Sequence, residues 1–166
     1  MTHHEPVLKL PGEGRVVSLG IAGDVSLKVE RTDSDGSMTA YEFTVPPGMA
    51  GPPAHIHQTW DELFYVLDGE MTFNLDGITR VAPAGSCVFV QHGCPHTFWN
   101  ASEHPVRQLT VFTPSGIENY FDEVSSTLQD GGDESLDAAI ALMRRHEMTV
   151  LDGNSPAYSA LDNEPF

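Results

Sequence analysis

The stretch that decides the fold of this chain is Pro53-Ala54-His55-Ile56-His57-Gln58-Thr59-Trp60-Asp61-Glu62. Successive side chains of an extended segment point to opposite faces, so His55 and His57 share one face, roughly 7 Å apart along the strand. Four residues separate His57 from Glu62. That spacing lets the chain turn and bring the carboxylate of Glu62 back toward the two imidazoles, so we expect the three side chains to converge.

A fourth candidate ligand comes from the later stretch Gly93-Cys94-Pro95-His96-Thr97-Phe98-Trp99-Asn100, in which a glycine-proline turn precedes His96. Three imidazoles and one carboxylate make a nitrogen and oxygen site suited to a divalent transition metal. The sequence does not choose among iron, manganese, nickel, cobalt and zinc. Four protein ligands on a metal that prefers five or six partners leave room for water, substrate or oxygen, which favours a reactive site.

At these residues the chain resembles the cupin superfamily. The first motif of that superfamily corresponds to His55, His57, Glu62 and Gly69, and the second to Gly85, Gly93, His96 and Asn100. Met49 stands where the first motif has glycine, and Gln91 stands where the second has proline. The resemblance covers roughly residues 14–121. It implies an all-β fold, the double-stranded β-helix or cupin jelly-roll barrel, with a metal held by His55, His57, Glu62 and His96.

The hydrophobic pattern independently predicts many short strands, as in an all-β sandwich or barrel. Glycine, proline and Asp-Gly turn signals separate these segments. The expected strands are 16–19, 25–30, 38–45, 63–67, 71–75, 78–81, 87–90, 96–99 and 106–112. We read residues 33–36 as a turn between two of them.

A short C-terminal helical extension is expected beyond residue 116. Apolar residues recur at helical spacing over 117–128, and Asp133 or Ser135 is positioned to cap a second helix that ends near His146. Leu136, Ile140 and Met143 would form one face of that helix. We therefore divide the chain into an N-terminal arm (1–15), a β-barrel (16–116) and C-terminal helices with a tail (117–166).

Composition limits the possible partners. Asp and Glu outnumber Lys and Arg by 24 to 8, which gives a formal net charge of −16. Nucleic acid and anionic membrane surfaces are thus poor partners. The chain shows neither a transmembrane run nor a signal segment, so a cytoplasmic protein is the default expectation. We expect a homodimer, because single-domain cupins commonly dimerise and exposed sheet edges need cover.

The residues near the expected ligands suggest an apolar substrate pocket. Phe64 and Val66 share a strand face with Glu62, and Phe98 shares one with His96, so these three are expected to line a cavity beside the metal. Tyr65 and Trp99 should then lie on the opposite faces. Trp60, in the loop between His57 and Glu62, is positioned to cover the entrance. Few cations are near these segments, which points away from phosphorylated substrates and toward a neutral, apolar or aromatic small molecule.

Within the cupins, residues 52–70 look most like the quercetin-dioxygenase-like group. That resemblance implies a metal-dependent dioxygenase acting on a hydroxylated aromatic or enolic compound, with Glu62 as both ligand and general base. Two alternatives stay open. One is a metal-assisted isomerase or polyketide cyclase that needs no dioxygen, and the other is a non-catalytic cupin that binds a small molecule.

Overall fold

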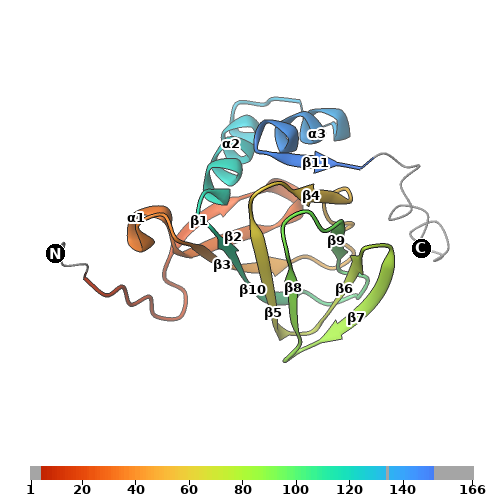
Figure 1. Cartoon of the computed structure of the whole chain (residues 1–166), viewed down its shortest axis with the longest axis horizontal. Helices are drawn as coiled ribbons and strands as arrows, with labels where there is room; N and C mark the ends of the chain where they lie inside the picture. Colours follow the sequence, from red (N-terminus) through yellow and green to blue (C-terminus); the bar gives the residue numbers. More distant parts are fainter. Residues whose placement is uncertain (1–4, 134, 152–166) are drawn as a thin grey trace.

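The structure, a computed structural model, describes residues 5–133 and 135–151. Within these residues the strands form two antiparallel sheets that face each other in a jelly-roll arrangement, and a helical layer lies over one end (Figure 1). The histidines at positions 3 and 4 and the expected C-terminal tail over 153–166 lie outside the described part of the chain. No helix of the described part is long and apolar enough to span a membrane.

The first sheet has six strands. Their spatial order is β1 (Arg15–Ser18), β2 (Asp24–Val29), β3 (Thr39–Val45), β10 (Val106–Thr113), β5 (Asp61–Asp68) and β8 (Cys87–Val90). The second sheet has five strands in the described residues. Their order is β11 (Met148–Val150), β4 (His55–His57), β9 (His96–Trp99), β6 (Glu70–Leu75) and β7 (Ile78–Pro83). The expected all-β jelly roll is therefore confirmed.

Alternation along the strands builds the interior between the sheets. On β5, Glu62, Phe64 and Val66 are buried, whereas Tyr65 between them is 40% exposed. Phe64 contacts Phe73 of β6 and Phe98 of β9, with ring centroids 5.1 and 5.4 Å apart. Burying an aromatic side chain of this kind contributes roughly 1.5–3 kcal/mol. These contacts across the sheets form the centre of the core.

The helical layer consists of α2 (Ile117–Gln129) and α3 (Leu136–Arg145). Ser135 caps α3 by accepting a hydrogen bond from the amide of Ala138, so the second of the two expected caps is the one used. Leu142 and Met143 are buried, whereas Leu136 is 61% exposed. Of the expected apolar face of α3, Met143 is buried and Ile140 is half-buried, whereas Leu136, the first residue of the helix, stays exposed at the rim of the layer.

After α3 the chain returns to the barrel as a strand that the sequence did not predict. Glu147 takes a positive φ of 60°, and the following strand β11 pairs with β4 in antiparallel register. A second difference lies at Arg31–Ser34, where the structure has a one-turn helix, α1, in place of part of the expected turn. The division of the chain into arm, barrel and C-terminal part stays a prediction.

Candidate metal centre

Three histidines converge from two neighbouring strands. His55 and His57 project from the same face of β4, and His55 is directly paired with His96 at the start of β9. All three are buried, and their candidate ligand nitrogens lie within 4.8 Å of one another. The structure thus brings together the imidazoles that the two sequence motifs placed 39 residues apart.

Glu62 reaches the same point from the opposite sheet. Its Oε2 atom lies 3.1 Å from Nε2 of His57 and also 3.1 Å from Nε2 of His96. The carboxylate is only 3% exposed. Because Glu62 stands near the start of β5, the turn after β4 needs only the short segment 58–60 to cross from one sheet to the other. The four expected ligands therefore lie together inside the barrel.

Backbone carbonyls orient two of the imidazoles. Nδ1 of His55 lies 2.8 Å from the carbonyl of Pro53, and Nδ1 of His96 lies 3.1 Å from that of Cys94. A carbonyl only accepts, so both Nδ1 atoms donate, and in neutral His55 the Nε2 atom then presents its lone pair to the centre. Contacts of this kind fix the tautomer and ring orientation of metal ligands.

Burial and mutual contact set the charge of the cluster. Burial first, and then the neighbouring His96 and His57, lower the pKa of His55 well below its usual value. Burial acts to raise the pKa of Glu62, but the hydrogen bonds from His57 and His96 lower it to about 2. At neutral pH the cluster therefore combines one carboxylate with a neutral His55, which is the protonation state that metal coordination requires.

The donor set fits a divalent transition metal. In the described part of the chain, three nitrogens and one carboxylate oxygen converge without a competing Lys or Arg, and this combination suits iron, manganese, nickel, cobalt or zinc. Within the described residues, the buried Nδ1 of His57 has no hydrogen-bond partner. The ring of His57 is thus held chiefly through Nε2, on the side that faces Glu62. His55, His57, Glu62 and His96 would hold the metal.

Gly51 allows the ligand strand to approach β9 closely. A Cβ atom at this position would lie 1.6 Å from the carbonyl oxygen of Phe98, and the φ angle of 77° favours glycine. A side chain would push residues 51–54 away from β9 and separate His55 from His96. Met49 stands at the motif's glycine position, and Gly51, two residues later, is the glycine that this packing requires.

A cavity of about 760 Å³ extends from the cluster toward the helical layer. His55, His57 and Glu62 form its inner end, together with Tyr41 and Phe112. Burial first, and then the nearby charge of Glu62, raise the pKa of Tyr41 well above its usual value, so its hydroxyl stays protonated. The inner end therefore offers one carboxylate acceptor and one phenolic donor among aromatic walls.

The expected pocket residues lie in different places relative to this cavity. Phe98 lines it, whereas Trp60, Phe64 and Val66 are absent from its lining. Trp60 is 8% exposed and packs on His57 and Phe112. It therefore holds the ring of His57 in place and does not cover an entrance. Phe64 and Val66 fill the closed end of the barrel, and Phe64 lies 6.5 Å from the ring of His96.

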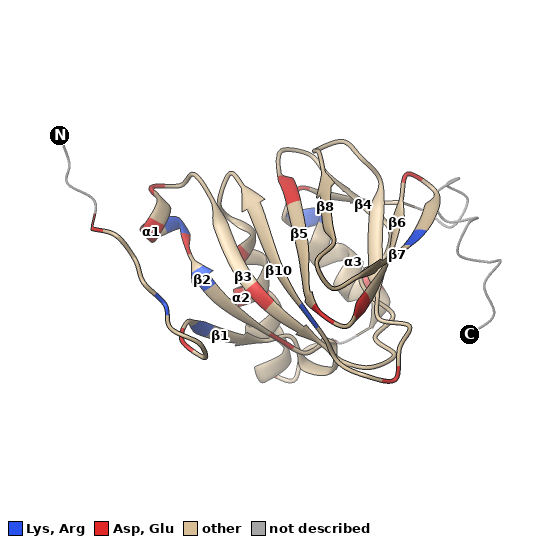
Figure 2. Ribbon diagram, turned by 90° about the horizontal axis from the view of Figure 1, so that it is seen from below, with Lys and Arg blue, Asp and Glu red and all other residues tan. Residues whose placement is uncertain are grey.

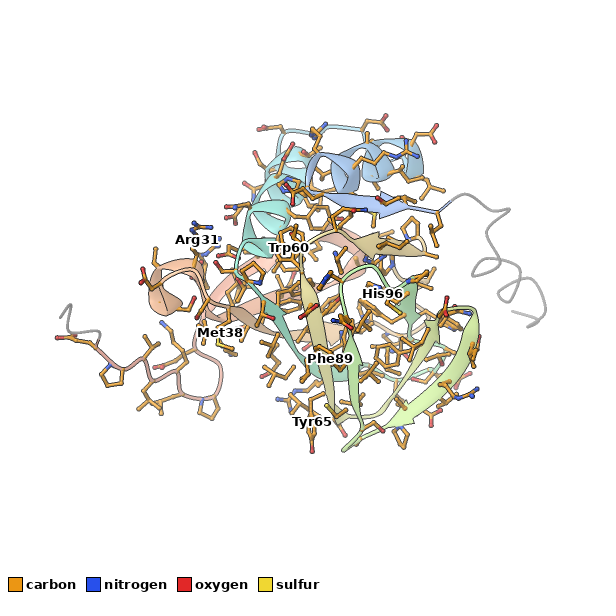
Figure 3. All side chains as sticks on the ribbon, viewed as in Figure 1. Arg31, Met38, Trp60, Tyr65, Phe89 and His96 are labelled. Carbon is orange, nitrogen blue, oxygen red and sulfur yellow. The ribbon has the colours of Figure 1, made fainter. Side chains whose placement is uncertain are left out.

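Figure 3 shows the labelled Tyr65 projecting away from the barrel, and the exposed fractions separate Phe89, at 61%, from His96, at 1%. As alternation predicts, Phe64 and Phe98 are buried while Tyr65 is exposed and Trp99 is half-buried. The sequence reading missed Tyr41 and Phe112. Both occupy inward positions on strands that were correctly expected, so the alternation of β3 and β10 carried the signal that could have found them.

Charged side chains surround the cavity sparsely. Figure 2 shows Lys and Arg scattered singly over the ribbon, among more numerous acidic residues. Of the described cations, Arg145 alone lines the cavity, at its outer part, and it forms an ion pair with Glu123 of α2. Among the residues that the structure describes, none at the inner end is an Arg or Lys that could bind a phosphate. A substrate without phosphate groups stays a prediction.

Comparison with known proteins places this arrangement in a family. Residues 41–112 match the model of the cupin domain family. An RmlC-like cupin from Shewanella frigidimarina has a TM-score of 0.57 at 19% identity, over 67% of this chain and 93% of that one. The protein KdgF from Halomonas sp. has a TM-score of 0.58 at 17% identity, over 66% and 96%. At such identities these structures establish the fold alone.

One curated relative is similar in sequence. It is a probable oxidoreductase, virH, of Hypocrea virens, 33% identical over 85 residues. The match covers 48% of this chain and 37% of that protein, so it spans little more than a third of the relative's length. The domain match, the shared fold and the converging histidines agree: residues 41–112 form a cupin domain.

Proposed function

We propose that this cupin is a metal-dependent oxidoreductase, a dioxygenase that acts on a hydroxylated aromatic or enolic small molecule. The observation that carries the proposal is the position of the cluster of three histidines and one glutamate at the inner end of an apolar cavity. Similarity over 85 residues to a protein named as a probable oxidoreductase supports the same class of chemistry. A metal bound by His55, His57, Glu62 and His96 would supply Lewis acidity at a substrate oxygen.

Glu62 is the residue we assign as general base. Its pKa of about 2 keeps it ionised at neutral pH, and its two oxygens allow one to stay with the histidines while the other accepts a hydroxyl proton from the substrate. The protonated hydroxyl of Tyr41 is available to donate a hydrogen bond to a substrate oxygen. The aromatic walls made by Phe98 and Phe112 would exclude water and orient a flat ring.

The test measures dioxygen uptake by protein that is reconstituted separately with iron, manganese, nickel, cobalt and zinc. Flavonols and other enolic phenols serve as the substrate panel. Glu62→Gln keeps the side-chain shape but removes the basic carboxylate, so turnover should fall about a hundredfold or more while some metal is retained. The matched control is Glu70→Gln on the exposed start of β6, which should leave turnover unchanged.

Two outcomes would replace the proposal. Conversion of a substrate without dioxygen uptake would favour an isomerase or cyclase. Tight binding of one of these compounds with no conversion under any metal would instead favour a binding protein.

A further inference from the structure

The cavity continues well beyond the metal centre. Its outer part is lined by Val124 and Leu128 of α2, by Leu142 of α3, and by Leu19 and Ala22 at the two ends of a short 3-10 helix (Gly20–Ala22). That turn lies directly on α2, because a Cβ atom on Gly20 would be 3.1 Å from Leu128 Cδ1. The barrel thus supplies the inner end and the helical layer supplies a second, outer compartment.

The outer compartment reaches the surface through apolar side chains. Ile21 is 96% exposed and Leu136 is 61% exposed, and both line the cavity. Exposed apolar residues that gather around one opening commonly mark a binding site, because a ligand that covers them removes apolar surface from water. The rim also carries Asp133, Ser135 and Arg145, so an apolar path ends in a polar edge.

Small residues on α3 leave this compartment open. Ala138, Ala139 and Ala141 all line the cavity, and their methyl groups fill little of the space that faces α2. The total volume of about 760 Å³ lies in the upper part of the range of roughly 300–1,000 Å³ that is typical of sites for drug-sized ligands. A compact ring at the metal would leave the compartment between the helices without contacts.

We propose that the substrate is an amphiphile, with an oxygen-bearing aromatic or enolic head at the metal centre and an unbranched or prenyl-like apolar chain between α2 and α3. The position of the head rests on the proposed function. The position of the chain rests only on the apolar outer compartment. Charged or sugar-bearing tails are disfavoured, because in the described residues the wall between the cluster and the rim offers few polar partners, chiefly Tyr120 and Thr127.

The experiment measures binding of 4-n-alkylphenols, from propyl to nonyl, to the full-length, metal-free protein by calorimetry. Each methylene buried in the outer compartment should tighten binding about fourfold, which corresponds to about 0.8 kcal/mol per CH₂. The gain should stop once the chain reaches the rim near Leu136. Dissociation constants that do not change with chain length would overturn the proposal. Metal-free protein keeps this result separate from dioxygen uptake, on which the proposed function depends.

Paired tryptophan variants on α2 locate the chain. Val124→Trp fills the compartment, so the gain with chain length should end at a shorter chain while propylphenol binds within about twofold of wild type. Ser126→Trp, on the exposed side of the same helix, should match wild type at every length. Ala139→Phe narrows the compartment from α3 and replaces Val124→Trp if that variant does not fold. Equal behaviour of the filling and control variants would contradict the placement.

Discussion

The buried carboxylate of Glu118 anchors the first turn of α2, and its removal should destabilise the protein strongly. The side chain is 6% exposed. It accepts hydrogen bonds from the amides of Arg31 and Gly116, both at 2.9 Å, and from the hydroxyl of Thr39 at 2.5 Å. These contacts join α2 to α1 and β3, and α2 is one wall of the cavity.

The size of the effect follows from the donors that Glu118→Ala would leave behind. A buried donor without a partner costs about 1–3 kcal/mol. Gly116 and Thr39 are buried, but the Gly116 amide also donates to Oγ1 of Thr39 at 3.3 Å and keeps that longer bond, while water can reach the amide of exposed Arg31. We therefore expect a loss of about 2–4 kcal/mol, which is a large share of the typical free energy of unfolding of about 5–15 kcal/mol.

Equilibrium unfolding in urea measures this change. The control is Glu123→Ala on the same helix, which removes an exposed carboxylate paired with Arg145 and His146 and should cost at most about 1 kcal/mol. Glu118→Gln keeps one accepting oxygen and should fall between the two. If Glu118→Ala and Glu123→Ala shift the midpoint equally, the reasoning from buried donors is refuted.

Three further predictions concern the cluster and the outer surface. A divalent metal at a hundred times its dissociation constant should stabilise the protein by about 2.7 kcal/mol, which a thermal melt measures as a higher melting temperature. His96→Ala should abolish this metal-dependent rise, and His104→Ala, in an exposed loop, should not. In chelator-treated protein, stability should fall from pH 7 toward 5 by at most about 1.4 kcal/mol per pH unit, because the lowered pKa of His55 lets only the unfolded chain gain that proton. The stability of the metal-free protein should fall again from pH 4.5 toward 2, because Glu62 is protonated first in the unfolded chain. His55→Gln should remove the loss between pH 7 and 5 but leave the loss between pH 4.5 and 2. A homodimer stays a prediction: light scattering should give twice the chain mass of 18.1 kDa, and Phe89→Glu, at a 61% exposed position on the edge strand β8, should shift it toward the monomer.

Most strand positions could be predicted because local chemistry determines them. The tight hairpin between β6 and β7 is an example, since Asp76 and Gly77 both take the positive φ angles that an Asp-Gly turn requires. The convergence of His55, His57, Glu62 and His96 was likewise readable, because alternation and motif spacing specify which face each side chain occupies.

The pocket was harder to predict, because alternation gives the face of a side chain but not its depth in the barrel. On β5, Glu62 stands at the level of the cavity, and each second residue advances roughly 6.6 Å along the strand. Phe64 and Val66 therefore face inward, as expected, yet they lie in the filled end of the barrel. Depth depends on how the two sheets pack, which no local pattern encodes.

The strand β11 shows a different limit and links the helical layer to the metal centre. Its three residues carry no strong strand signal, yet Met148, Thr149 and Val150 pair with His57, Ile56 and His55. On its other edge, β4 pairs with β9 at the single position His55–His96. Hydrogen bonds from Gln58 to Glu147 and from Leu151 to Ala54 extend the contact with the C-terminal segment on both sides.

Among the described residues, the segment that follows α3 therefore supplies most of the backbone pairing of the ligand strand. Met148 is also buried beside His57 and lines the cavity. One short C-terminal unit thus shapes the outer compartment through α3 and holds two metal ligands in register through β11. A change in the packing of α3 would move β11, and with it His55 and His57, because three residues of β11 pair with the backbone of β4. The C-terminal extension is therefore part of the site that it covers.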